Sequence, residues 1–189
     1  KASGRDVLLV DSDPQGSASF WCSLREDAYP ERRIPCIQKF GNKVHREVEE
    51  LARKYEDVII DAGGRDSAEL RGSVLVADKI FTPLKPSQFD VWSLEHMEKL
   101  VGEARMLNRE LQAWVVINQA STNPRITEAD EAREFLKELT ELSLSDVVIK
   151  DRVAFRRAAQ DGLCVTELRE KRSKAVLEIR SLYSEVFGD

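Results

Sequence analysis

The sequence predicts an α/β fold, a doubly wound and mostly parallel sheet with helices on both faces. Three observations lead to this prediction. Short, continuous apolar runs rich in Val and Ile are typical of strands that are buried in a parallel sheet. Longer segments with apolar residues at helical spacing separate these runs, and such alternation is typical of parallel sheets. The 189 residues contain no internal repeat and no low-complexity linker, so residues 1–189 are predicted to form a single domain.

The predicted elements follow one another in a regular order. Buried strands are predicted at residues 6–10, 58–60, 113–117 and 146–149, with another directly before a loop at residues 83–87. A short edge strand is expected at residues 34–37, because proline is tolerated at the edge of a sheet. Helical spacing marks residues 18–28, 44–55, 67–77, 91–108, 126–139, 152–159 and 171–187.

Composition excludes several classes of protein. Hydrophobic residues make up 42% and charged residues 33%, which is the balance of a soluble globular protein. The net charge of -5 argues against nucleic-acid binding through bulk charge and leaves a local basic patch possible. No apolar run approaches the roughly 18 residues of a membrane helix. Three widely spaced cysteines fit no metal site, which favours free thiols in a reducing cytoplasm.

The first residues resemble the end of an element rather than a beginning. The chain starts at Lys1 without a methionine, and residues 1–5 have the pattern of a polar helix end with Gly4 at its C-cap. We therefore expect a preceding segment that supplies the first strand, loop and helix of the fold.

Two predicted strands end in carboxylates. Asp61 follows the strand at residues 58–60 and precedes the flexible pair Gly63 and Gly64, whereas Asp11 and Asp13 follow the strand at residues 6–10. The carboxyl ends of parallel strands share one edge of a sheet, which is where open α/β sheets bind ligands. The alternative for Asp11 or Asp13 is N-capping of the next helix, and one residue can do both.

Two more strand ends carry polar or turn-forming residues, the loop at residues 83–87 and Asn118. Neighbouring carboxylates suit a hydrated Mg²⁺ ion that binds substrate phosphates, because Mg²⁺ keeps several of its waters. The amide of Asn118 is suited to hydrogen bonding with the edge of a purine. A phosphate cradle of the GxxxxGK[ST] or GxGxxG type does not occur in these residues.

Five segments together resemble the ParA/MinD family of deviant Walker ATPases. Residues 7–17, VLLVDSDPQGS, resemble the A-prime or switch I motif, and residues 58–64 resemble Walker B with switch II. Residues 77–90 match an AD…P..PS..D pattern, and residues 115–118 resemble the strand whose Asn approaches adenine. Residues 152–167 resemble the tail of partition ATPases, so the resemblance spans nearly the whole chain.

The resemblance implies specific roles and the cofactors ATP and Mg²⁺. Asp13 would help to position the hydrolytic water, while Asp11 and Asp61 would hold Mg²⁺ through its waters. The nucleotide-binding residues would be Pro83, Pro86, Ser87 and Asn118, and switch II would contain Gly63, Gly64, Arg65 and Asp66. A P-loop in the preceding segment would supply two phosphate-binding lysines, and ATP would lie between two subunits of a homodimer that switches with nucleotide.

The sequence also departs from the family. Without a P-loop, the 189 residues alone are expected to bind ATP poorly. The run from Asp61 to Asp66 differs from the usual forms, and Arg65 with Asp66 would either form a salt bridge in switch II or contact a partner. An amphipathic membrane-targeting helix is not evident, which favours the partition branch over the septum-placement branch and predicts no membrane contact.

A tentative DNA-binding surface lies in the last quarter of the chain. From residue 150 onward there are nine Lys or Arg against seven Asp or Glu. The candidate phosphate contacts are Arg152, Arg156, Arg157, Lys171, Arg172 and Lys174, which would bind weakly, without sequence preference and with strong salt dependence. Ordinary solvated helix faces interleaved with Glu170 and Glu178 are an equally weighted alternative.

These observations favour a cytoplasmic, nucleoid-associated ParA-type ATPase that acts in plasmid or chromosome partition. It would form an ATP-dependent homodimer, bind non-specific DNA, and hydrolyse ATP to ADP and phosphate under stimulation by a ParB-type centromere-binding protein. One alternative is a ParA-like ATPase that positions a protein cargo without DNA. Another is an interaction module that lacks the P-loop and catalysis.

Overall fold

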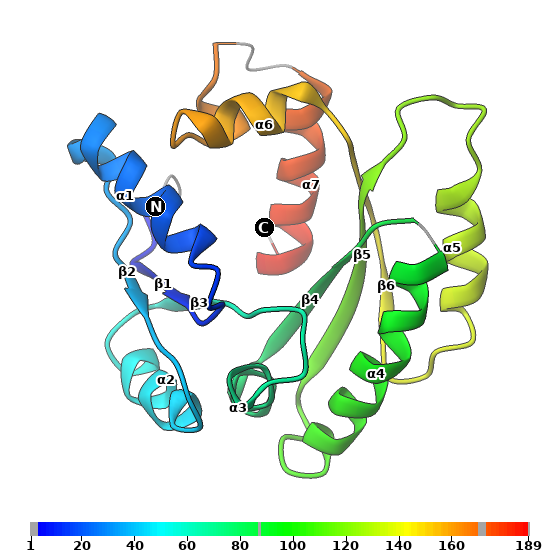
Figure 1. Ribbon diagram of the computed structural model, residues 1–189, viewed down its shortest axis with the longest axis horizontal. Helices are drawn as coiled ribbons and strands as arrows, with labels where there is room; N and C mark the ends of the chain where they lie inside the picture. Colours follow the sequence, from blue (N-terminus) through cyan, green and yellow to red (C-terminus); the bar gives the residue numbers. More distant parts are fainter. Residues whose placement is uncertain (1–3, 87, 170–172, 189) are drawn as a thin grey trace. The chain divides into compact units, whose positions relative to one another are not determined.

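Two three-stranded parallel sheets make up the strands of the computed structural model, which describes residues 4–86, 88–169 and 173–188 and leaves the side chains of residues 88–92 undescribed. The sheets belong to two compact units, Lys1–Ala77 and Asp78–Asp189 (Figure 1). All strand pairs in the described residues are parallel. The α/β class with parallel strands is confirmed, and a single domain stays a prediction.

Unit 1 has the strand order β2-β1-β3. Within it, α1 lies on one side of the sheet, and α2 and α3 lie on the other (Figure 1). Its elements are β1 (Val7–Asp11), α1 (Ser17–Ala28), the 3-10 helix η1 (Pro30–Arg32), β2 (Cys36–Gln38), α2 (Val44–Ala52), β3 (Asp57–Asp61) and α3 (Ala68–Val76).

The central strand β1 carries the sheet of unit 1. Leu8 and Val10 are completely buried, as predicted for a strand with neighbours on both sides. Pro35 precedes β2, which is an edge strand of this sheet as expected. β3 was predicted to be buried, but Ile59 is 46% exposed because β3 occupies an edge position in its three-stranded sheet.

Unit 2 has the strand order β4-β5-β6. Helices α6 and α7 lie on one face of this sheet, and α4 and α5 lie on the other (Figure 1). Its elements are β4 (Lys79–Leu84), α4 (Gln88–Arg105), β5 (Gln112–Ala120), α5 (Glu128–Leu136), β6 (Ser143–Lys150), α6 (Val153–Gln160), the 3-10 helix η2 (Val165–Glu167) and α7 (Lys174–Phe187).

Strand β4 extends further than the sequence predicted. Pro83 was expected in a loop but lies within β4, opposite Val116 of β5. β4 is an edge strand of this sheet, a position at which proline is tolerated. Strand β5 likewise runs past the predicted end at Asn118 to Ala120.

The last helix begins later than expected. α7 starts at Lys174, and the hydroxyl of Ser173 accepts a hydrogen bond from the backbone N–H of Val176. This cap fixes the start of the helix, because serine satisfies an otherwise free N–H there. None of the helices in the described residues is long and apolar enough to cross a membrane.

Candidate functional site: a carboxylate cluster and a pocket with an apolar wall

The carboxyl ends of β1 and β3 bring the predicted acidic residues of unit 1 together. Asp11 lies opposite Asp61 in the register of the two strands. Ser12 links the carboxyl ends of β1 and β3. Its N–H and its hydroxyl both donate hydrogen bonds to the carbonyl oxygen of Asp61, at 2.8 and 3.0 Å. The sequence analysis did not single out Ser12, which is 1% exposed. The contact spans 49 residues, so no local pattern could have revealed it.

Asp11 caps α1. It is fully buried, and its Oδ2 accepts a hydrogen bond of 2.8 Å from the backbone N–H of Ser19 in the first turn of that helix. Its Oδ1 accepts a second bond of 3.2 Å from the N–H of Asp13. A negative charge at a helix N-terminus is favourable. Of the two roles left open for Asp11, capping is therefore visible in the structure, and Mg²⁺ binding through water stays a proposal.

Asp13 lies half-buried in the loop that follows β1. Its Oδ1 accepts a hydrogen bond of 2.9 Å from the N–H of Gln15, while its Oδ2 has no hydrogen-bond partner within the described residues. The switch II segment approaches this carboxyl group closely, because a Cβ atom at Gly63 would lie 3.3–3.4 Å from its atoms. Glycine at position 63 thus allows the backbone to pack against Asp13, which leaves one carboxylate oxygen available.

Asp61 is the carboxylate most open to solvent. Although the residue as a whole is exposed, its carboxyl group is partly desolvated, and this desolvation raises its pKa above the usual 3.8. The negative charges of Asp11 and Asp13 raise the pKa further. Three like charges favour a cation, and carboxylate oxygens are the donors that Mg²⁺ accepts. The described residues contain no group of three or more His, Cys, Asp or Glu side chains that could hold a metal ion, so binding of Mg²⁺ through its waters stays a proposal.

Switch II carries an ion pair that was not predicted, whereas contact of Arg65 and Asp66 with a partner stays a prediction. Asp66 pairs with Arg71 of α3 through two hydrogen bonds, Oδ1 with Nε at 2.7 Å and Oδ2 with an Nη at 2.8 Å. Arg65 is exposed and makes no ion pair with Asp66. Gly64 meets no atom within 4 Å of an added Cβ, so the loop is open on that side.

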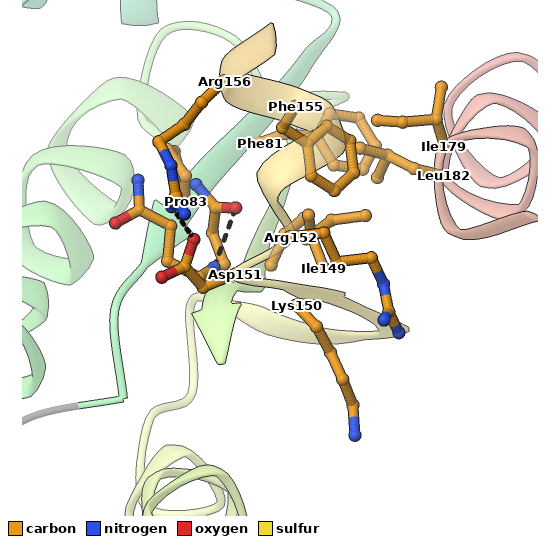
Figure 2. Close-up of a pocket in the computed structure, with 13 residues that line it drawn as sticks. Phe81, Pro83, Ile149, Lys150, Asp151, Arg152, Phe155, Arg156, Ile179 and Leu182 are labelled. Atoms are coloured by element: carbon orange, nitrogen blue, oxygen red, sulfur yellow. Dashed lines mark hydrogen bonds and ion pairs between the residues drawn. The ribbon is translucent and has the colours of Figure 1, made fainter. Parts of the chain in front are cut away.

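A pocket of about 580 Å³ opens in unit 2 (Figure 2). Its apolar side is formed by Phe81, Phe155, Ile179 and Leu182, which gather in Figure 2. Asp151 and Arg156 form an ion pair on the opposite side. The volume falls in the range of small-molecule sites, and an apolar wall with a few polar groups suits a flat heteroaromatic ring.

Two predicted nucleotide-binding residues, Pro83 and Asn118, line this pocket. Asn118 lies in an irregular part of β5, where the register with β6 shifts between Ile117 and Ala120 and Gln119 has a φ of 55°. Such bulges and left-handed non-glycine residues are enriched at functional sites. Asn118 Oδ1 accepts from the N–H of Gln119 at 2.9 Å, so its amide NH₂ group is the part available to a ligand.

The other two predicted nucleotide-binding residues do not contribute to the described pocket. Pro86 is buried and does not line it. Ser87 lies outside the described residues. The loop after β4 therefore adds Pro83 alone to the lining that the structure describes.

The structure separates the predicted DNA-binding residues into three groups. Arg152 pairs with Glu178 of α7 at 2.5 Å, with both side chains mostly buried, and Arg156 pairs with Asp151. Arg157 and Lys174 are exposed, without an ion-pair partner in the described part of the chain. Lys171 and Arg172 lie outside the described residues. Arg152 and Arg156 also line the pocket, which sequence reasoning did not anticipate.

Comparison with known proteins gives relatives over most of the chain. No family model matches it. A maintenance of carboxysome distribution protein A from Gloeobacter kilaueensis is 30% identical over 171 residues, which cover 89% of this chain and 74% of that protein. The protein of the same name from Halothiobacillus neapolitanus is 26% identical over 184 residues, 95% of this chain and 82% of that one. Plasmid partition protein A of Escherichia coli is 26% identical over 108 residues, 57% of this chain and 26% of that protein.

Solved structures share the fold. The cell division ATPase MinD of Pyrococcus furiosus superimposes with a TM-score of 0.73 at 15% identity, over 98% of this chain and 86% of that one. Apo McdA of Cyanthece gives 0.72 at 16% identity, over 96% and 89%. MinD of Pyrococcus horikoshii in complex with Mg-ADP gives 0.69 at 15% identity, over 98% and 85%. From the sequence relatives and this shared fold, the chain belongs to the ParA/MinD family of P-loop ATPases.

Proposed function

We propose that this protein is a ParA-type positioning ATPase that hydrolyses ATP to ADP and phosphate. The observation that carries the proposal is the carboxylate cluster, in which Asp11 and Asp61 lie in register and Asp13 packs beside Gly63. The raised pKa of Asp61 supports a cation as the natural partner of the cluster. The family supports ATP as the substrate, since related MinD is solved in complex with Mg-ADP.

Each carboxylate has a distinct proposed role. Asp61, which is exposed, holds Mg²⁺ through the waters of the ion. Asp11, which is buried and caps α1, contributes its negative charge. The ion, when bound, neutralises charge on the phosphate oxygens. Asp13 positions the attacking water with Oδ2, because Oδ1 already accepts the N–H of Gln15. Phosphoryl transfer needs this kind of positioning and charge stabilisation more than covalent chemistry.

Asn118 and Pro83 are retained as the proposed contacts of the nucleotide base. The NH₂ group of Asn118 donates to an acceptor on the purine edge, and Pro83 contacts the ring. Pro86 and Ser87 are retained as proposed contacts of the loop after β4, and Gly63 to Asp66 as proposed switch II.

The test uses the protein expressed from its native reading frame. Asp13→Ala should abolish Mg-dependent ATP hydrolysis while nucleotide binding persists, because only the positioning of the water is lost. Asp6→Ala, directly before the first residue of β1, is the matched control and should hydrolyse ATP as the wild type does. Unchanged turnover in Asp13→Ala would contradict the assignment.

For the finer function, we propose a cytoplasmic, nucleoid-associated homodimer that forms on ATP, binds non-specific DNA and responds to a ParB-type partner in plasmid or chromosome partition. The similarity to plasmid partition protein A of Escherichia coli supports DNA as the cargo. Arg157 and Lys174 are the described candidates for phosphate contacts, because they are exposed and carry no ion pair in the described residues.

A charge-reversal experiment measures the proposed DNA contacts. Arg157→Glu with Lys174→Glu should weaken ATP-dependent DNA binding and reduce its salt dependence by about one unit of log–log slope per lost contact. Lys99→Glu with Arg109→Glu makes the same change in net charge on α4 and its following turn, and should leave binding intact. Equal loss in both pairs would show that bulk charge is responsible.

The second candidate is an ATPase that positions a protein cargo without DNA. Two relatives that are named for carboxysome distribution favour this candidate. The aligned residues cover 82% and 74% of the lengths of these relatives. DNA binding in a gel-shift assay with ATP at low and high salt distinguishes the candidates. Binding that falls with salt supports partition on DNA, whereas ATP hydrolysis without any DNA binding supports a protein cargo.

A further inference from the structure

Arg65 is an exposed cation in the segment that follows Asp61, and no described residue neutralises its charge. It follows directly on Gly63 and Gly64, and the backbone at Gly63 packs against the carboxyl group of Asp13. Arg65 is exposed and has no hydrogen-bond or ion-pair partner within the described residues. An arginine without a partner in this position is able to bind an incoming anion.

Asp66, the acidic residue next to Arg65 in the sequence, already has an ion-pair partner. Both oxygens of Asp66 are bound by Arg71, in a paired geometry that holds the carboxylate toward α3. Paired Arg–carboxylate bonds are stronger and more specific than single ones. The Asp66–Arg71 pair thus prevents Asp66 from competing for the guanidinium of Arg65.

Arg65 also does not neutralise the cluster itself. Within the described residues, no ion pair joins Arg65 to Asp11, Asp13 or Asp61. A cation that follows Asp61 by four residues and pairs with none of these carboxylates is suited to an anion brought there by a metal ion. A nucleotide phosphate is such an anion.

We propose that Arg65 is a catalytic residue that contacts the terminal phosphate of ATP and stabilises the charge on its oxygens during hydrolysis. The proposal rests on the ATPase function proposed above. Water attacks the terminal phosphorus, the bond from that phosphorus to the bridging oxygen breaks, and ADP leaves with the electron pair. The protons of the water pass to phosphate and solvent, and Arg65 donates hydrogen bonds without transferring a proton. A planar guanidinium suits the geometry of phosphate oxygens.

The first test measures the turnover and nucleotide affinity of Arg65 variants in the protein from its native reading frame. Arg65→Ala should lower kcat by about 10²-fold, the loss typical of one charge-stabilising donor, with a much smaller change in the Kd of a fluorescent ATP analogue. Arg65→Lys should recover part of this loss. Arg53→Ala, an exposed arginine at the C-cap of α2, is the matched control and should retain full kcat.

The second test changes Arg65 indirectly. Arg71→Ala removes the partner of Asp66, and we expect the released carboxylate to pair with Arg65 and lower kcat. Adding Asp66→Ala to this variant should restore turnover, an outcome that a merely structural role of the ion pair would not produce.

The outcomes separate this inference from the proposed function. A wild-type protein that hydrolyses ATP together with Arg65→Ala within twofold of its kcat would overturn the inference alone. The same holds if Arg65→Ala weakens nucleotide binding as much as it lowers kcat. A wild-type protein without hydrolysis would overturn the proposed function, and the role of Arg65 with it.

Discussion

At the scale of single residues, the negative charge of Asp61 serves the proposed site but lowers the stability of the folded protein. Its pKa is raised in the folded protein, by desolvation first and then by Asp11 and Asp13. The folded state therefore holds the proton of Asp61 more tightly than the unfolded state does. The stabilising contribution of protonated Asp61 is present at low pH and is lost as the pH rises through the folded pKa.

Asp61→Asn should consequently stabilise the protein at neutral pH. Relief of repulsion at a partly exposed carboxylate contributes at most about 1 kcal/mol, so we expect a rise in Tm of about 2–4 °C or less. The gain should grow as the pH rises through the folded pKa of Asp61 and then level off. Thermal unfolding of the variant and the wild type from acid to neutral pH measures it. Asp6→Asn is the control, and a gain that does not vary with pH would contradict the argument.

Gly63 is the second residue with a sharp expectation. A Cβ atom there would meet the carboxyl atoms of Asp13 at 3.3–3.4 Å, a distance at which the neighbour has to move by a few tenths of an ångström. Gly63→Ala should therefore lower kcat by about 10-fold by misplacing Asp13, since small displacements of a positioning group are expensive in rate. Gly64→Ala is the matched control, because nothing lies within 4 Å of its added Cβ. Equal turnover in the two variants, each checked for an unchanged Tm, would contradict this role.

At the scale of elements, Glu98 joins α4 to the turn before β6. Its carboxylate accepts hydrogen bonds from the backbone N–H groups of Thr140 and Glu141, the latter at 3.1 Å. Desolvation raises the pKa of Glu98, but these hydrogen bonds outweigh it, so the pKa is lowered overall. The stabilisation is thus present above the unfolded pKa and is lost as the pH falls through the folded pKa.

Glu98→Ala should destabilise the protein by about 1–2 kcal/mol at neutral pH, because it leaves two backbone donors without a charged acceptor. Urea unfolding measures the difference, which should shrink as the pH falls. Glu95→Ala, an exposed position on the same helix, should change stability by less than about 0.5 kcal/mol. A pH-independent loss in Glu98→Ala would point to packing instead of the hydrogen bonds.

At the scale of the whole molecule, the predicted single domain requires the two units to cooperate in unfolding. We predict that they unfold in one transition, as a single domain does. Trp21 lies in unit 1, and Trp92 and Trp114 lie in unit 2. With Trp92 and Trp114 replaced by phenylalanine, Trp21 reports on unit 1 alone. The unit 2 substitution Glu98→Ala should then shift the Trp21 transition as much as it shifts a circular dichroism transition. An unshifted Trp21 signal would show two independent units.

The predicted fold and the ends of its strands came from local patterns. The apolar run at residues 113–117 identified β5 as a buried parallel strand, and Val115 and Ile117 are fully buried. Asp11 and Asp61 were predicted to share an edge from the parallel arrangement alone, and they do so in register. Such features are readable because burial and strand direction repeat along a few consecutive residues.

The sequence alone thus determined the α/β class, the helices on both faces and the acidic strand ends. Only the tertiary structure decided how these side chains are used. Asp11 caps α1 over eight residues, Ser12 binds Asp61 across 49, and Glu178 holds Arg152 across 26. Asp66 pairs with Arg71 and not with Arg65, although Arg65 is its immediate neighbour in the sequence. The physical reason is that hydrogen bonds and ion pairs depend on distance and orientation in space, which the chain fixes only after its apolar strands and helices have packed.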